Sequence, residues 1–269
     1  MPSRIASLAV VSLLLLSGCG GILGDESPTP PSENRTNDSA RWLAPGLTSD
    51  GVEDAEALAS THRRSVESRS RTAAMRTQVT AAENGSLLSN RSYVVRVADD
   101  GRRLAEQTGD SRTDDEYRPR VYWYDPNVSE YAARSGANDG EVSYTYSRET
   151  NGELFSDGTY ADRLYSLFTV LNVSVAPETV DRSVHRLEAS ERSLLFDGRE
   201  LRNVTLTARV DYSGVVRSYE LQYETERGGT SVRITERVRI TDLGSTEVER
   251  PEWVETARNE SGGSAAALT

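Results

Sequence analysis

Residues 203–240 read NVTLTARVDYSGVVRSYELQYETERGGTSVRITERVRI. Three runs of alternating apolar and polar residues follow one another here, separated by Ser213-Gly214 and by Gly228-Gly229. The apolar positions are Val204, Leu206, Ala208 and Val210 in the first run, Val215, Tyr219, Leu221 and Tyr223 in the second, and Val232, Ile234, Val238 and Ile240 in the third. A period of two with glycine-containing turns predicts three antiparallel strands that have one apolar face and one wet face.

The same period recurs upstream, at Tyr93–Val97, Val121–Tyr124 and Val142–Ser147. Turn dipeptides separate the strand-like runs, and these are Asp139-Gly140, Asn151-Gly152, Asp157-Gly158 and Asp197-Gly198. The chain is therefore expected to form an antiparallel sheet of about 9 to 11 strands.

Two segments have the helical period of 3.6 residues instead. In the first, Asp50 is the expected cap and Glu53 completes a capping box; the stripe on one face is Val52, Ala55, Leu58, Ala59, His62 and Val66. In the second, Thr159 is the expected cap, and the stripe is Tyr160, Leu164, Leu167, Phe168 and Leu171. Only a curved sheet offers these stripes enough apolar surface. The predicted fold is α+β, a strongly curved antiparallel sheet whose concave face is covered by two amphipathic helices.

The N-terminus predicts export. Residues 1–18 combine one positive charge, Arg4, with an apolar stretch and small residues before Cys19. The apolar stretch is shorter than the roughly 20 residues that span a bilayer as a helix. Because the small residues run directly into Cys19, the site resembles the lipobox of prokaryotic lipoproteins, which implies a mature chain that begins at a lipidated Cys19. An ordinary signal peptide is the alternative.

The remaining chain divides by composition. Residues 19–41, rich in proline, serine and threonine, are the expected disordered tether; 42–257 form one folded domain, and 258–269 a disordered tail. Cys19 is the only cysteine, so no internal disulfide is expected. Eight Asn-x-Ser/Thr sequons are candidate N-glycosylation sites, as befits an exported protein: Asn34, Asn37, Asn84, Asn90, Asn127, Asn172, Asn203 and Asn259.

The charge composition of the chain indicates the solvent in which it works more than it indicates a binding partner. All 31 basic residues are arginine, 42 residues are acidic, and the formal net charge is −11. An acidic surplus without lysine is typical of proteins from extreme halophiles, where molar salt shortens the Debye length to about 3 Å. A nucleic-acid partner is not expected of so acidic a chain.

No catalytic or metal-binding pattern stands out. The two histidines, His62 and His185, fall in separate elements, and a core or rim role is the better interpretation of His62. The acidic cluster Asp110, Asp114, Asp115 and Glu116 lacks the register of a calcium loop. Tyr122-Trp123-Tyr124 is read as cross-strand packing in preference to a ligand platform. The sequence predicts no enzyme activity, no cofactor and no metal.

Both ends of the expected domain resemble a family of haloarchaeal lipoproteins to which no activity is assigned. The residues that carry the resemblance are Trp42–Leu47, Asp50–Asp54, His62 and Asp242–Trp253. The layout also resembles the half-barrel of the LolA and LolB lipoprotein carriers and of the mycobacterial LppX type. That second resemblance implies a concave face that holds acyl chains.

Two functions are therefore considered. The first is a lipid-anchored protein on the extracellular face of the cell membrane that binds a hydrophobic or lipid-like ligand, with Leu164, Phe168, Tyr219 and Leu221 as its predicted lining. The second is a structural or interaction protein of the haloarchaeal cell envelope, with a filled core and no small ligand. The membrane, reached through the lipid on Cys19, is the one partner predicted; the sequence points to no particular protein partner.

Overall fold

The structure is a computed structural model that describes residues 40–111, 118–136, 140–148 and 156–266. Several sequence predictions lie outside these residues: the signal segment, Cys19 and nearly all of the tether, the sequons at Asn34 and Asn37, and Asp114–Glu116 of the acidic cluster. The turn expected at Asn151-Gly152 lies outside them as well.

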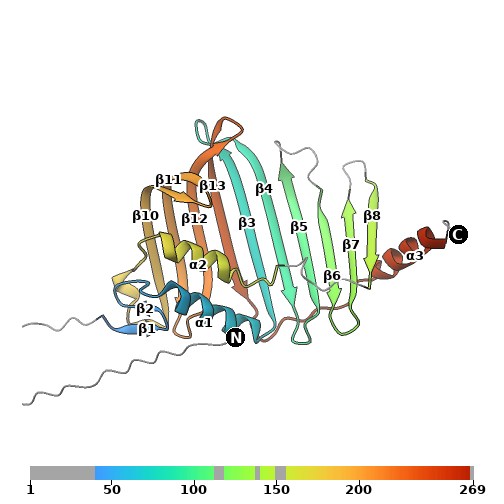
Figure 1. Ribbon diagram of the computed structural model, residues 1–269, viewed down its shortest axis with the longest axis horizontal. Coiled ribbons are helices and arrows are strands. Elements are labelled where there is room, and N and C mark those ends of the chain that lie inside the picture. The colour runs from blue at the N-terminus through green and yellow to red at the C-terminus, as the bar shows by residue number, and fades with distance from the viewer. Residues whose placement is uncertain (1–39, 112–117, 137–139, 149–155, 267–269) are drawn as a thin grey trace, which may run out of the picture. The chain divides into compact units, whose positions relative to one another are not determined.

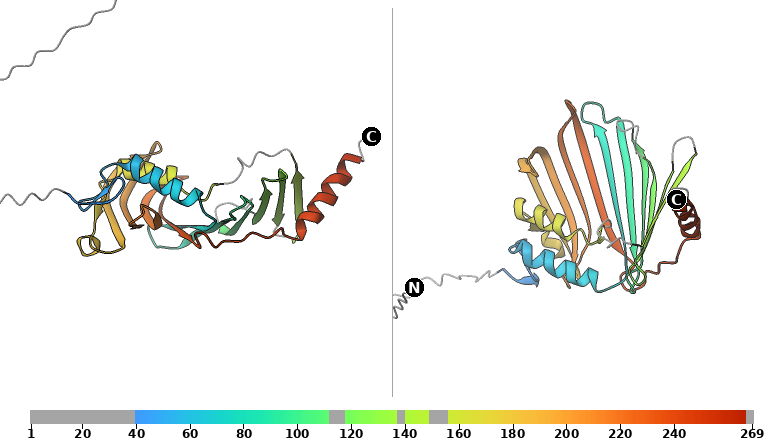
Figure 2. Two further views of the ribbon diagram at one scale, coloured as in Figure 1. Left: turned by 90° about the horizontal axis from the view of Figure 1, so that it is seen from below. Right: turned by 45° about the vertical axis from the view of Figure 1, so that its right-hand side comes forward.

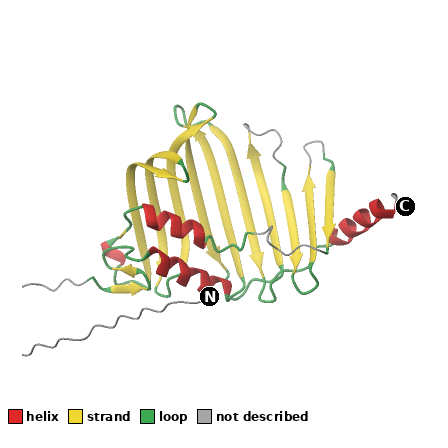
Figure 3. Cartoon of the chain, viewed as in Figure 1, coloured by secondary structure: helices red, strands yellow, loops and turns green. Residues whose placement is uncertain are grey.

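One antiparallel sheet of 11 strands dominates the fold, in the order β8-β7-β6-β5-β4-β3-β13-β12-β11-β10-β9 (Figures 1 and 3). The strands are β3 (Arg71–Ala81), β4 (Leu87–Val97), β5 (Arg103–Ser111), β6 (Arg120–Asp125), β7 (Glu130–Gly136), β8 (Val142–Ser147), β9 (Ser174–Val175), β10 (Val184–Phe196), β11 (Arg199–Asp211), β12 (Val216–Arg227) and β13 (Thr230–Thr241). The sheet is open, because its edge strands β8 and β9 do not pair with each other. With three helices beside the sheet, the predicted α+β class and strand number are confirmed.

The last three predicted strands are β11, β12 and β13. Along β11 the apolar row is almost completely buried, and it continues across the sheet because Leu206 pairs with Leu221 and Tyr219 pairs with Val238. Strand β13 then pairs with β3, which joins the two series of hairpins into one sheet. The period-two pattern therefore marks one continuous apolar face, as expected.

Helix α1 (Ala55–Glu67) and helix α2 (Ala161–Val170) lie on that apolar face, called here the helix side (Figures 1 and 2). Their buried residues belong to the same core cluster as the apolar rows of β10–β12; from the helices these are Leu58, Leu164, Leu167 and Phe168. A short 3₁₀ helix, η1 (Pro177–Thr179), precedes β10. The predicted covering of one sheet face by two helices is confirmed.

Both helices begin a few residues away from their predicted caps. The cap of α1 is Asp54 and not Asp50, since the Asp54 carboxylate accepts a hydrogen bond from the Ala57 N–H at 2.9 Å. Helix α2 has Tyr160 at its N-cap in the left-handed region, with φ of 57°. Thr159 still contributes, because its hydroxyl accepts from the Ala161 N–H at 3.3 Å.

A two-stranded sheet of β1 (Trp42–Ala44) and β2 (Leu47–Thr48) precedes α1. Gly46 turns the chain between them with φ of 79°, and a Cβ at this position would lie 2.2 Å from the Asp54 carbonyl oxygen. Only glycine allows the turn to press against the start of α1 so closely. The carbonyl of Gly46 accepts hydrogen bonds from the N–H groups of Glu53 and Asp54, which fixes the turn to the helix.

The third helix, α3 (Trp253–Ala266), lies against the other face of the sheet, on β7 and β8 (Figures 1 and 2). It packs with Trp123, Ala132 and Tyr144, whose strand neighbours Tyr122, Ala133 and Thr145 face the helix side. Helix α3 does not follow from the sequence pattern, which predicts a disordered tail over residues 258–269, whereas the helix continues to Ala266. Its second half contains Gly262-Gly263, which carries no helical signal.

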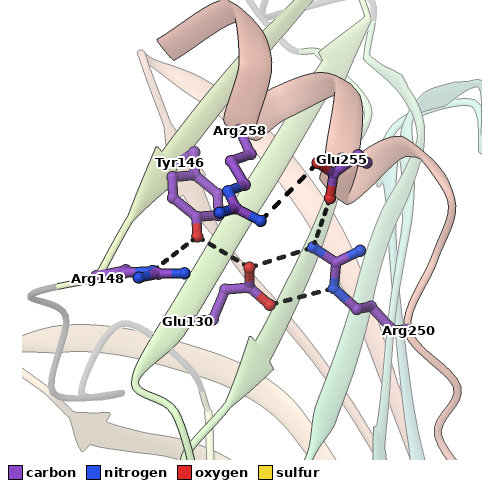
Figure 4. A network of polar contacts seen from close by, with 6 residues as sticks. All are labelled: Glu130, Tyr146, Arg148, Arg250, Glu255 and Arg258. Atoms are coloured by element: carbon purple, nitrogen blue, oxygen red, sulfur yellow. Dashed lines mark hydrogen bonds and ion pairs between the residues drawn. The ribbon is translucent and has the colours of Figure 1, made fainter. Parts of the chain in front are cut away.

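Polar contacts fasten α3 to the sheet (Figure 4). The buried Glu130 carboxylate accepts hydrogen bonds from Arg250 at 3.2 Å and from the Tyr146 hydroxyl at 2.9 Å. Arg250 also contacts Glu255 of α3 at 3.4 Å. Glu130, the first residue of β7, thereby holds Arg250 in the segment that leads into α3.

Candidate functional site

Two hollows open on the helix side, and the first of them is lined in part by Arg163 of α2. The first has a volume of about 290 Å³ and is lined by Arg163, Phe196, Asp197, Arg199, Leu201, Tyr223, Thr225 and Ile234. The second has a volume of about 260 Å³ and is lined by Met75, Thr77, Val79, Ser89, Arg91, Ser92, Tyr93, Gln107 and Arg227. Each volume alone is slightly below the range for small-molecule sites, roughly 300–1,000 Å³.

The two hollows adjoin where β13 meets β3. Ile234 lines the first and Val79 lines the second, and these residues are paired across the two strands. Together with Val232 they form a small apolar cluster, on which Leu88 and Tyr223 pack. The floor between the hollows is therefore apolar and continuous.

A buried carboxylate, Glu236, stands on the same row of β13 two residues from Ile234. Its side chain accepts a hydrogen bond from the Tyr219 hydroxyl and one from Arg163 at 3.2 Å. Burial and the Glu236 carboxylate raise the pKa of Tyr219 well above its ordinary value, so the phenol remains a donor. Burial lowers the pKa of Arg163, but Glu236 together with Tyr219 and Tyr223 raises it by more, so the guanidinium stays charged.

Arg163 connects α2 to the mouth of the first hollow. Besides Glu236 it contacts Asp197 at 3.4 Å, and its guanidinium lies 4.7 Å from the centre of the Phe196 ring. Asp197 and Phe196 belong to the β10–β11 hairpin. This arginine is therefore already matched by two carboxylates and an aromatic ring.

The four residues predicted to line a ligand site are brought together by the fold. Leu164, Phe168, Tyr219 and Leu221 all lie in the core cluster between α2 and the sheet, and each is at most 5% exposed. None of them belongs to the lining of the two hollows. Their role as ligand contacts stays a prediction. In this structure the two residues of α2 and the two residues of β12 belong to one packed core.

Both histidines serve the framework. His62 is fully buried: its Nδ1 accepts from the Val216 N–H at 3.1 Å, which leaves Nε2 to donate to the Thr159 carbonyl at 2.8 Å. Burial lowers the pKa of His62 below its ordinary value. The core interpretation of His62 agrees with this position. His185 lies on β10 with its Nδ1 3.0 Å from the Thr179 carbonyl oxygen.

The aromatic run on β6 is divided between the two faces. Trp123 is buried under α3, while Tyr122 and Tyr124 face the helix side. Within the described residues, no group of three or more His, Cys, Asp or Glu side chains is arranged to hold a metal ion. Of the described sequons, Asn90 is half-buried, and the exposed asparagines are Asn84, Asn127, Asn172, Asn203 and Asn259.

Glu236 and the lining of the hollows are the features that sequence reasoning missed. One signal was present: Glu236 occupies an inward position in the row Val232, Ile234, Val238 and Ile240, where an unpaired carboxylate is costly. A charged residue on an otherwise apolar row indicates a buried partner, although the row does not say which one.

A family model described as a family of unknown function, DUF7537, matches residues 4–257. The chain belongs to this family. No curated protein matches the chain. The haloarchaeal origin and the lipidation expected from the sequence stay predictions.

Among solved structures, the chain is similar to LprF from Mycobacterium bovis, with 10% identity over 76% of this chain and 98% of that one, and a TM-score of 0.32. It is also similar to a LolA superfamily protein from Nitrosomonas europaea, with 9% identity over 71% of this chain and 94% of the other, and a TM-score of 0.25. A DUF1329 family protein from Desulfovibrio piger has 9% identity, coverage of 76% and 96%, and a TM-score of 0.27. All three likenesses are distant.

Of the described helices, none is both long and apolar enough to cross a membrane.

Proposed function

We propose that the protein binds a hydrophobic or lipid-like molecule in the two hollows on the helix side. One observation carries the proposal: the hollows adjoin over the paired residues Ile234 and Val79, so that open space lies against a continuous apolar floor. Water in such a space makes few hydrogen bonds with the apolar floor. An apolar chain that displaces this water is stabilised by the hydrophobic effect.

The shape of the site favours an elongated ligand. Each hollow alone is small, but the two lie in line across β11–β13 and β3–β5. A molecule that covers both would contact Tyr223 and Ile234 at one end and Met75 and Tyr93 at the other. This arrangement suits a chain better than a compact ring system.

The role is binding without catalysis. The two histidines, which are the usual general bases, engage backbone groups and line neither hollow. Glu236 is occupied by Tyr219 and Arg163, and it supports the floor instead of facing a reacting group.

The protein is also proposed to be a lipoprotein that is anchored at Cys19 on the extracellular face of the cell membrane. The family match begins at residue 4, so the segment that carries the lipobox-like site belongs to the family's shared sequence.

A second candidate is a structural protein of the cell envelope that binds no small molecule. The packing of Leu164, Phe168, Tyr219 and Leu221 favours it, because α2 fills the space that these residues were predicted to leave for a ligand. The two hollows on the helix side favour the first candidate.

The test compares two tryptophan substitutions on neighbouring strands. Thr77 of β3 lines the second hollow, and Thr235 of β13 lies on the other face of the sheet. Both threonines are half-buried, so Thr235→Trp is a matched control for Thr77→Trp. The full-length chain, purified in molar salt, is extracted with organic solvent and also measured by native mass spectrometry.

Wild type and Thr235→Trp are expected to carry a bound hydrophobic molecule, and Thr77→Trp is expected to lose it while keeping its thermal unfolding midpoint. A ligand-free mass for the wild type, together with no uptake of an added decyl-chain probe, would overturn the binding role and leave the structural one.

A further inference from the structure

A further hollow lies at the end of the sheet where η1 leads into β10. Its volume is about 460 Å³, and its lining comes from η1, the segment after it, the start of β10 and one residue of β11: Glu178, Thr179, Arg182, Ser183, Val184, His185, Arg186 and Arg209. Three guanidinium groups and one carboxylate meet there, in a chain whose formal net charge is −11. The hollow is therefore a basic site on an acidic protein.

The carboxylates around this hollow do not match all of its arginines. Glu178 pairs with Arg186 at 3.0 Å, and Arg186 also pairs with Glu188 at 2.9 Å. Arg182 donates through its Nε to the Glu178 carbonyl oxygen at 3.1 Å and forms no ion pair with a described residue. Arg209 stands directly opposite Arg186 on the neighbouring strand and has no hydrogen bond or ion pair to a described residue. Because like charges directly opposite each other destabilise a strand pair, an anion bound between them would be stabilising.

Exposed aromatic side chains flank the same end of the sheet. Tyr212 is 74% exposed, and its N–H donates to the carbonyl of Ser183 in the hollow at 3.1 Å. Trp42 of β1 is 63% exposed and follows Arg41, whose guanidinium donates to the Val180 carbonyl at 2.7 Å. Figure 1 shows β1 at the same end of the sheet as the start of β10. Tryptophan and tyrosine concentrate at the level of lipid head groups, because their apolar rings carry a polar tip.

The chain enters the domain at this end as well. The expected tether, residues 19–41, connects the proposed lipid on Cys19 to Trp42. A flexible chain of that length has a root-mean-square reach of about 25 Å, so the anchored domain would meet the bilayer at a high local concentration. The acidic Asp181 beside this entry is matched by Arg41 at 2.8 Å.

We propose that this end of the domain docks on the bilayer, with Arg182 and Arg209 bound to phosphate groups of lipid heads in the hollow. Trp42 and Tyr212 lie among the head groups beside it. This inference rests on the proposed anchor at Cys19 and adds the surface that faces the membrane. A guanidinium stays charged at all relevant pH values and binds a phosphate through two parallel hydrogen bonds. Molar salt screens charges that are separated by water, but it leaves the burial of the aromatic rings in place.

Arginine footprinting of the anchored, full-length chain tests the docking surface. The chain is purified from its own membranes, the mass of its N-terminal peptide shows whether Cys19 carries lipid, and the protein is placed in vesicles in molar salt. Vesicles of phosphatidylglycerol contain phosphate, whereas vesicles of digalactosyldiacylglycerol do not. Phenylglyoxal then modifies accessible guanidinium groups, and mass spectrometry gives the rate at each arginine. Arg192 of β10 and Arg202 of β11 are internal controls, because both are exposed and neither lines the hollow.

Phosphatidylglycerol is expected to slow the modification of Arg182 and Arg209 about fivefold relative to the phosphate-free vesicles, because charged hydrogen bonds to phosphate are strong. The rates at Arg192 and Arg202 should not change. Inorganic phosphate, added to the phosphate-free vesicles, should give little protection, because it lacks the bilayer that holds the aromatic rings.

The aromatic part has its own pair of variants. Trp42→Ser with Tyr212→Ser is expected to weaken the protection of the two arginines. Leu195→Ser, which removes a side chain that is 72% exposed near the β10–β11 turn, should leave the protection unchanged.

Equal rates in the two kinds of vesicle would overturn the docking surface, while a lipid found on Cys19 would uphold the anchor. Inorganic phosphate that protects as well as phosphatidylglycerol would indicate a simple anion site and overturn the membrane contact. A Cys19 without lipid would overturn the anchor and, with it, this inference.

Discussion

His62 joins three segments that are far apart in the sequence. Its ring lies on α1, receives the Val216 N–H from the start of β12 and donates to Thr159 just before α2. Without the imidazole, the Val216 N–H and the Thr159 carbonyl would each be buried with this hydrogen bond unmade, at a cost of about 1–3 kcal/mol per group. One neutral imidazole thereby holds both covering helices in place against the sheet.

This position predicts that stability declines as the pH falls below the ordinary pKa of histidine. Burial lowers the folded-state pKa of His62 below its ordinary value of 6.5, so the unfolded chain binds the proton more readily. The stabilisation is complete above pH 6.5 and is lost as the pH falls from there toward the folded pKa, by at most about 1.4 kcal/mol per pH unit. Urea unfolding midpoints at pH 7.5 and 5.5 measure it.

Two variants isolate the group. His62→Gln is less stable at every pH but lacks this decline, and His185→Gln retains it. Asp211 and Glu130 do not interfere, because their lowered pKa values mean that their contributions to stability are lost only as the pH falls through and below their ordinary values of 3.8 and 4.5. An identical decline in wild type and His62→Gln would contradict the assignment.

Glu236 shows how much a single residue reveals before the structure is known. Its inward place on β13 follows from the alternation around Ile234 and Val238. The partners of Glu236 cannot be predicted in this way. Tyr219 lies on another strand, and Arg163 lies on a helix whose position over the sheet is set by tertiary packing. Sequence periodicity assigns a face, whereas hydrogen-bond partners depend on packing.

Among the elements, α1 and α2 were predictable and α3 was not. The first two have broad apolar stripes that end in buried residues such as Val66 and Phe168. The described part of α3 offers Val254 and Ala257, and its stability comes from Trp123 and the Glu130 network on the sheet. A helix held mainly by its docking site leaves a weak pattern in its own sequence.

The Glu130 network predicts what releases α3. Arg250→Ala leaves the Glu130 carboxylate, whose side chain is 9% exposed, with the Tyr146 hydroxyl, 2.9 Å away, as its remaining hydrogen-bond donor among the described residues. A cost of about 2–3 kcal/mol is expected, because a largely buried carboxylate has lost its charged partner. Amide hydrogen exchange in residues 253–261 should accelerate more than exchange in β11–β13.

Arg258→Ala provides the control for this experiment. Arg258 contacts Glu255 at 3.9 Å, and both side chains are about half exposed, so its loss should change stability and exchange little. Equal effects of the two substitutions would show that the Glu130 network does not dock the helix.

At the scale of the whole molecule, the site depends on the pairing of β13 with β3, which cannot be read from the sequence. The pattern predicted the number of strands and their apolar faces, but not that β13 pairs with β3. That pairing sets Ile234 beside Val79 and so places the two hollows over one floor. Pairing between distant strands depends on the whole sheet, and local alternation carries no information about it.

The proposed anchor gives a prediction for the intact protein in its cell. The proposed attachment is a lipid on Cys19, the only cysteine of the chain. Two lipid chains on Cys19 would hold the protein stably, because burial contributes about 0.8 kcal/mol per methylene. Cys19→Ser removes the thiol that forms the thioether and is expected to move the protein from the membrane fraction to the medium.

Fractionation with two washes distinguishes this anchor from other attachments. Wild-type protein should resist a wash that changes the salt concentration, since apolar burial does not depend on charge pairing, and it should be released by detergent. Cys19→Ser protein found in the medium should keep the unfolding midpoint of the wild type, because Cys19 lies outside the domain that begins near Trp42. Cys19→Ser protein that still sediments with membranes and resists the salt wash would rule out lipidation as the attachment.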